Sequence, residues 1–203
     1  MSKCKTSVEV GGMGHSVKRK EDARFIRGQG NYVDDVVRPG MVFMDIVRSP
    51  YAHAKIKSIN TEKALAHPGV AAVITGETLK EYNLHMMPTL MSDTQMVLPI
   101  DKVCYQSQEV AAVIATDRYS AADGIELVEV EYEPLPVVVD PHKATDPDAP
   151  IIRDDKEGQE SNHIWHWEEG DKEGTEEVFR NSDVVIKEKI YIPRIHVASI
   201  ETC

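Results

Sequence analysis

The sequence contains little cysteine, and what it has is widely scattered. Three cysteines occur in 203 residues, at Cys4, Cys104 and Cys203. None forms a C-x-x-C pair, so the sequence predicts neither a disulfide framework nor a four-cysteine zinc or iron–sulfur site. Sparse, unpaired cysteine is typical of a reducing compartment, and we therefore expect a cytoplasmic protein.

Basic charge and long apolar runs are also scarce. Lysine and arginine number 23 against 34 aspartates and glutamates, which gives a formal net charge of −11. So acidic a chain repels a phosphate backbone, which argues against nucleic-acid binding. The one dense basic cluster, at 18–20, is followed at once by Glu21 and Asp22, so we expect a solvated turn. No run approaches the roughly 20 apolar residues of a membrane span, and we expect neither a span nor a signal peptide.

The remaining composition is that of a folded protein, with 41% hydrophobic and 28% charged residues. Helices are predicted from Asn60 or Thr61 to His67, and from Tyr119 to Leu127 after an Asp117 cap. Apolar runs predict buried strands, and one strictly alternating run predicts a strand with one face in water. These strands are 41–47, 70–75, 110–115 and 128–133. The two resulting strand–helix–strand units predict an α/β (α+β) fold.

Residues 79–98 lack a clear period and predict a long, irregular apolar loop. Four methionines, Met86, Met87, Met91 and Met96, lie in this stretch, which also contains Pro88 and ends before Pro99. Methionine is flexible and polarisable, so we expect this loop to pack against another chain or another part of a larger protein.

Prolines and aspartates dominate residues 134–155 and predict a linker. Beyond it the pattern predicts strands at 162–167 and 184–192 and a helix at 171–180. About 40 residues are too few for an independent core, so this part is expected to begin a larger domain. The predicted division is an arm at 1–17, an α/β domain at 18–140, a linker at 141–160 and an incomplete domain at 161–203.

Two clusters near the carboxyl end invite a functional interpretation. His163 and His166 could bind a metal, but side chains three apart on a strand point to opposite faces. Trp165 and Trp167 share a face and are expected to fill a domain or subunit contact. The carboxylates of 168–177 lack the apolar pocket of a catalytic pair, and Asp171 is instead expected to cap the helix that follows.

Three other candidates have weak support. His53 follows a proline turn, where a general base is conceivable but a hydrogen bond to the backbone is commoner. Cys104 lies in an apolar, strand-like setting and is expected to be inert packing. The glycines of 11–14 lack the preceding strand and following helix of a phosphate loop. We therefore predict no catalytic, cofactor-binding or metal-binding residue in this chain.

Several stretches resemble, in the same order, segments of the molybdenum hydroxylase large subunits. They are 20–35, the turn Arg48-Ser49-Pro50-Tyr51-Ala52-His53-Ala54, 68–75 and 130–136. The resemblance implies the α/β hammerhead domain of that family up to about residue 140. The first elements of the molybdenum-cofactor-binding region would follow.

A second set of stretches resembles the branch of this family that oxidises carbon monoxide. It comprises 84–90, 106–111, 162–164, 193–196 and 201–203. The resemblance implies oxidation of CO with water to CO₂ at a molybdopterin cytosine dinucleotide, whose molybdenum is bridged to copper. It further implies an iron–sulfur small subunit, an FAD medium subunit, and a dimer of such heterotrimers.

The cysteine loop that binds copper in this branch, Ala-Tyr-Arg-Cys-Ser-Phe-Arg, does not occur in the chain. Cys203 follows Glu201-Thr202 and does not match that loop, so no catalytic residue is transferred. We expect an N-terminal part of a large subunit that is inactive by itself and binds no cofactor alone. Two alternatives are an aldehyde or N-heterocycle hydroxylase of the same family, and a stand-alone protein-interaction module.

Overall fold

The computed structural model describes residues 13–14, 19–89, 93–155 and 158–199. The chain divides into two compact units, Gly40–Lys187 and Met1–Pro39 with Glu188–Cys203. Within the described ranges, no helix has the length and apolar character needed to cross a membrane.

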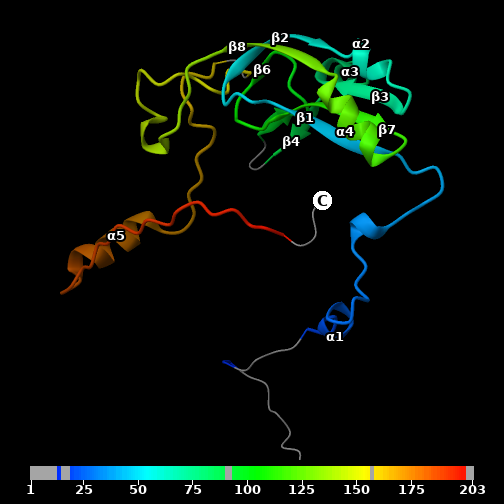
Figure 1. The fold of residues 1–203 in the computed structure, drawn as a ribbon. Coiled ribbons are helices and arrows are strands. Elements are labelled where there is room, and N and C mark those ends of the chain that lie inside the picture. The colour runs from blue at the N-terminus through cyan, green and yellow to red at the C-terminus, as the bar shows by residue number, and fades with distance from the viewer. Residues whose placement is uncertain (1–12, 15–18, 90–92, 156–157, 200–203) are drawn as a thin grey trace, which may run out of the picture. The chain divides into compact units, whose positions relative to one another are not determined.

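Sheet A of the larger unit has three antiparallel strands in the order β1-β7-β3 (Figure 1). They are β1 (Phe43–Arg48), β7 (Glu109–Ala115) and β3 (Val70–Thr75). The central strand β7 is the most buried, with Val110 and Val113 fully covered, as its continuous apolar run predicts. The prediction of a buried strand is wrong for one face of β1, where Met44 is 63% exposed.

Helix α4 (Arg118–Glu126) packs on β1 and β7 (Figure 1). Asp117 caps it, because its Oδ1 accepts hydrogen bonds from the Tyr119 and Ser120 amides at 3.0 and 2.9 Å. Gly124 allows the close approach to the sheet: a Cβ there would lie 2.7 Å from Val113 Cγ1. The predicted helix and its cap are thus confirmed.

The shorter helix α2 (Glu62–Leu65) contacts both β3 and α4. Thr61 occupies the N-cap position, but the side-chain bond comes from Asn60, whose Oδ1 accepts from the Glu62 amide at 3.0 Å. Sequence left the choice between these two residues open, and the structure divides the capping role between them.

Sheet B is also antiparallel, in the order β6-β2-β8. Its strands are β6 (Lys102–Val103), β2 (Ala54–Asn60) and β8 (Glu129–Pro134). The alternation in β8 buries Val130 and Tyr132 against the core and leaves the glutamates towards water, as predicted. Ile59 and Val130 touch both buried clusters and so join the cores of the two sheets.

Four elements around this core, β2, α3 (Gly76–Glu81), β4 (Met86–Pro88) and β5 (Thr94–Met96), were not predicted from the sequence. Along the chain, strand β2 lies between the two strands of the first predicted strand–helix–strand unit, and the two strands of the second unit, β7 and β8, lie in different sheets. The predicted loop at 79–98 contains order instead. Helix α3 begins at a Thr75 cap, and β4 pairs with β5 as a hairpin.

The predicted strands at 162–167 and 184–192 are also absent from the structure. A strand needs a neighbouring backbone to accept its hydrogen bonds, and none of the described residues pairs with these two segments. Between them, α5 (Lys172–Asn181) confirms the predicted helix; Asp171 Oδ1 accepts from the Gly174 amide at 2.9 Å. The Pro-rich stretch contributes one short 3₁₀ turn, η3 (Pro141–Lys143).

The smaller unit contains α1 (Asp22–Phe25) and the 3₁₀ turn η1 (Val33–Asp35). Gly28, at φ +68°, ends the turn after α1. The Phe25 and Tyr32 rings stack with centroids 5.6 Å apart. Arg19 pairs with Asp22 at 3.0 Å, which agrees with a solvated turn; Lys18 and the glycines at 11 and 12 lie outside the described residues.

Candidate functional site

The turn that links β1 to β2 contains the first candidate, His53. Hydrogen bonds hold this turn in place where the chain passes from sheet A to sheet B. Ser49 is 2% exposed, and its Oγ accepts from the Tyr51 amide at 3.0 Å. The Ser49 backbone exchanges hydrogen bonds with the loop before β7, donating to Gln108 O and accepting from the Ser107 amide, both at 2.9 Å. Ser107 adopts φ +65° to allow this exchange.

His53 belongs to the same turn and is 5% exposed. Its Nδ1 lies 2.5 Å from Pro136 O, and since a carbonyl only accepts, Nδ1 carries the proton and donates. The His53 carbonyl in turn accepts from the Leu135 amide at 2.9 Å. His53 therefore fastens the end of β8 to the turn, which is the backbone-bonding role that sequence favoured for it.

A cavity of about 560 Å³ opens beside the hairpin and β6, within the larger unit. Apolar, cationic and anionic side chains all line this cavity. The lining residues are Lys55, Gln95, Met96, Pro99, Asp101, Lys102, Cys104, Tyr105, Gln108, Ile152, Arg153, Asp154 and Asp155.

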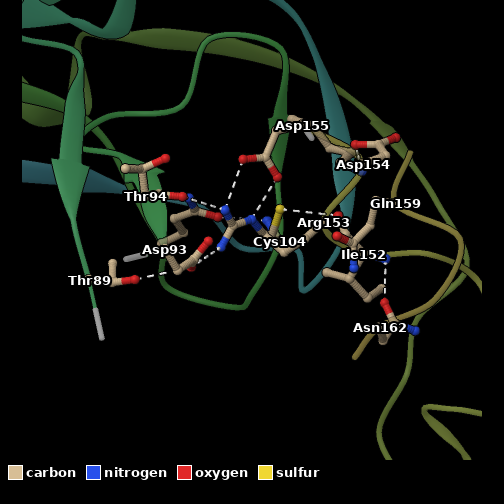
Figure 2. A network of polar contacts seen from close by, with 12 residues as sticks. Thr89, Asp93, Thr94, Cys104, Ile152, Arg153, Asp154, Asp155, Gln159 and Asn162 are labelled. Carbon is tan, nitrogen blue, oxygen red and sulfur yellow. Dashed lines mark hydrogen bonds and ion pairs between the residues drawn. The ribbon is translucent and has the colours of Figure 1, made fainter. Parts of the chain in front are cut away.

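Arg153 is the centre of the polar network on this wall (Figure 2). Its Nε and Nη2 donate to the two Asp155 oxygens at 2.7 and 2.9 Å, the bidentate geometry that guanidinium and carboxylate favour. Nη2 also donates to Thr94 O at 2.6 Å, and Nη1 lies 3.4 Å from Asp93 Oδ2. The Arg153 hydrogen bonds lower the pKa of the Asp155 carboxyl, and Asp155 raises the pKa of Arg153.

Two further contacts attach the same segment to β6 and the residue that follows it. Lys102 Nζ donates to Asp154 Oδ1 at 2.5 Å, and Cys104 Sγ donates to Ile152 O at 3.5 Å. Asn162 braces the segment from the other side, because its Oδ1 accepts from the Ile152 amide at 2.8 Å (Figure 2). The linker composition of 141–160 does not by itself predict this attachment. A lone arginine beside two aspartates was the available signal.

The Cys104 thiol is a packing group in this arrangement. Burial is the main cause that raises its pKa, so the thiol stays protonated at neutral pH. A protonated thiol is a poor nucleophile and a poor metal ligand. The interpretation of Cys104 as inert packing agrees with this geometry, although it lines the cavity.

The candidates near the carboxyl end stay apart from the cavity wall. The His163 and His166 rings lie 6.3 Å apart by centroid, and His166 Nε2 is 3.2 Å from Glu168 Oε1. Trp165 and Trp167 are 45% and 58% exposed, so their expected contact with a partner stays a prediction. Across the described ranges, no three His, Cys, Asp or Glu side chains converge in a way that could hold a metal ion.

Comparison with known proteins places this fold in a family. The model of the aldehyde oxidase and xanthine dehydrogenase a/b hammerhead domain matches residues 27–136, more than half of the chain. The carbon monoxide dehydrogenase large chains of Afipia carboxidovorans and Hydrogenophaga pseudoflava are 56% and 52% identical over 95% and 96% of this chain. The nicotine 6-hydroxylase large subunit of Paenarthrobacter nicotinovorans is 34% identical over 94%.

Solved structures agree with the sequence matches. A crystal structure of Cu,Mo-CO dehydrogenase in its carbon monoxide reduced state is 58% identical, with a TM-score of 0.72, over 85% of this chain and 23% of that one. The chain spans about a quarter of the length of the curated relatives it matches. The predicted hammerhead fold and the family resemblance are both confirmed. The chain belongs to the aldehyde oxidase and xanthine dehydrogenase a/b hammerhead domain family.

Proposed function

We propose that the chain forms the hammerhead-bearing part of the large chain of a carbon monoxide-oxidising molybdenum enzyme. The difference in identity between equally extensive matches carries this proposal. Identity to the carbon monoxide dehydrogenase large chain is 56%, whereas identity to a hydroxylase of an N-heterocycle is 34% over nearly the same share of this chain. A shared fold alone does not explain why the identity to one relative is so much higher than the identity to the other.

The described residues suit a scaffold better than a reaction centre. Charged side chains on the cavity wall form two ion pairs, Arg153 with Asp155 and Lys102 with Asp154. Because each charge has an opposite partner, none of the four is poised for proton transfer. The described residues do not fit a molybdenum or copper site either, because no cluster of His, Cys, Asp or Glu ligands converges among them. We assign the molybdopterin cytosine dinucleotide, with its molybdenum and copper, to other parts of the large chain.

The same proposal implies the partners of the assembly. Electrons from CO oxidation would pass to an iron–sulfur small subunit and then to an FAD medium subunit, and two such heterotrimers would form a dimer. The sparse, unpaired cysteines support a cytoplasmic location for the whole assembly.

The test is to recover the native protein from its source with antibodies against these 203 residues. We expect a polypeptide about four times as long, in a complex that reduces an electron-accepting dye with CO. A complex that oxidises only aldehydes or N-heterocycles would move the chain to another branch of the family. A free 203-residue polypeptide without redox activity would instead identify a stand-alone interaction module.

A further inference from the structure

The hairpin β4–β5 belongs to neither sheet and exposes apolar side chains on both of its faces. Met86 lies opposite Met96 in the ladder, and Met87 lies opposite Gln95. Residues directly opposite each other share a face, and the next residue along a strand points to the other face. Met86 and Met87 therefore point to different faces, and they are 42% and 40% exposed. Val97, two residues after Gln95, adds a 41% exposed side chain on the Met87 face.

Such a hairpin is not expected to keep its shape unaided. Two paired strands of three residues are at most marginally stable in water without a third strand or a covering helix. Here the Arg153 network replaces that support: Nη2 holds Thr94 O at 2.6 Å, and Nη1 reaches Asp93. Asp93 in turn accepts from Thr89 Oγ1 at 3.0 Å, so one guanidinium braces both strand ends (Figure 2).

A braced hairpin with two apolar faces has the features of a preformed wedge. A hairpin that is already ordered before it meets its partner loses less conformational entropy on docking. Methionine adapts its shape to the surface that it meets. Apolar side chains on both faces of a pair of strands require a groove, because a flat surface covers only one face.

We propose that the β4–β5 hairpin inserts as this wedge into an apolar groove formed by the rest of the large chain, and that Arg153 is its positioning residue. The inference rests on the proposed function, which leaves about three quarters of the large chain outside these residues. The rest of the same large chain is favoured over a separate subunit, because its covalent link to these residues gives it a high effective concentration.

A photo-crosslinking experiment tests the occupant of the groove. The matching quarter of the Afipia carboxidovorans large chain is replaced by this 56% identical chain, and the complete enzyme is assembled with its partner subunits. A benzophenone amino acid is placed at Met87 or, as the control, at Tyr119, which is 83% exposed on α4. From Met87 we expect cross-links within the same large chain, to peptides outside these 203 residues, at several times the Tyr119 yield.

Other cross-linked products overturn the proposal: products with the small or medium subunit, with a second large chain, or with solvent only. Dye reduction by CO in the unsubstituted hybrid enzyme is measured separately. An active enzyme with the wrong cross-links therefore rejects the wedge without rejecting the proposed function, and an enzyme that never assembles rejects the proposed function.

Arg153→Lys tests the positioning role, because lysine keeps the charge but loses the planar fork. We expect at least a tenfold loss of amide-exchange protection in the hairpin and a lower Met87 cross-link yield, with protection of β7 unchanged. The matched control, Arg180→Lys on α5, leaves all three readouts unchanged. Equal loss of protection in β7 would indicate general destabilisation, and an unaltered hairpin would remove Arg153 from this role.

Discussion

Gly124→Ala should destabilise the protein, against the usual preference of helices for alanine. A Cβ at this position lies 2.7 Å from Val113 Cγ1 and 2.9 Å from Val70 Cγ2. Both valines are β-branched strand residues with stiff side chains, so α4 has to move away from sheet A. Overpacking of this severity costs about 3 kcal/mol, and alanine returns about 1 kcal/mol of helix propensity. The expected net loss is about 2 kcal/mol.

Thermal unfolding followed by circular dichroism measures this change. In a chain of this size a loss of about 2 kcal/mol lowers Tm by roughly 4–8 °C. Ala122→Gly, on the exposed face of the same helix, is the control and should cost about 1 kcal/mol through propensity alone. Combining Gly124→Ala with Val113→Ala should recover about 1 kcal/mol of coupling. An increase in Tm for Gly124→Ala alone would refute the close packing of α4 on sheet A.

Three other side chains give independent tests. Asp155 has a lowered pKa, so its contribution to stability is present above about pH 4 and is lost as the pH falls through the lowered value. Asp155→Asn should therefore weaken the acid dependence of hairpin amide exchange, and an unchanged profile would contradict this linkage. His53→Ala removes the buried donor to the Pro136 carbonyl and should cost about 0.5–1.5 kcal/mol in urea unfolding; a neutral result would reject the fastening role. Cys104 should react with a thiol reagent at neutral pH at least tenfold more slowly in the native than in the unfolded protein, and equal rates would contradict its burial.

The parts of the fold that sequence predicted well are those with a strong local signal. The apolar run of β7, the alternation of β8 and the Asp117 cap each depend on a few neighbouring residues. Helix α3 had such a signal too, since Thr75 and Thr78 form its capping box, but the apolar residues that follow obscured it. The short strands of the hairpin give almost no period, because three residues cannot establish one.

The polar network was beyond a sequence argument for a different reason. Arg153 and Thr94 are 59 residues apart, and their bond forms because the chain after β8 returns to the hairpin. Apart from η3, the described residues of 141–160 contain no helix or strand, and composition alone cannot tell an attached segment from a free one. The distinction depends on whether a long side chain meets a carboxylate and a carbonyl in the right geometry.

The segment at 184–192 shows where a correct pattern gives a wrong element. Val184, Ile186, Ile190 and Ile192 recur on one side of an extended chain, which is the signature of a strand with one buried face. Their side chains are 75–83% exposed, and no described residue pairs with their backbone. Periodicity specifies which face of a segment is apolar, but strand formation also needs a neighbouring edge. The prediction fails because no described residue supplies that neighbouring edge. The alternation therefore identifies a segment that is suited to strand pairing but is not paired.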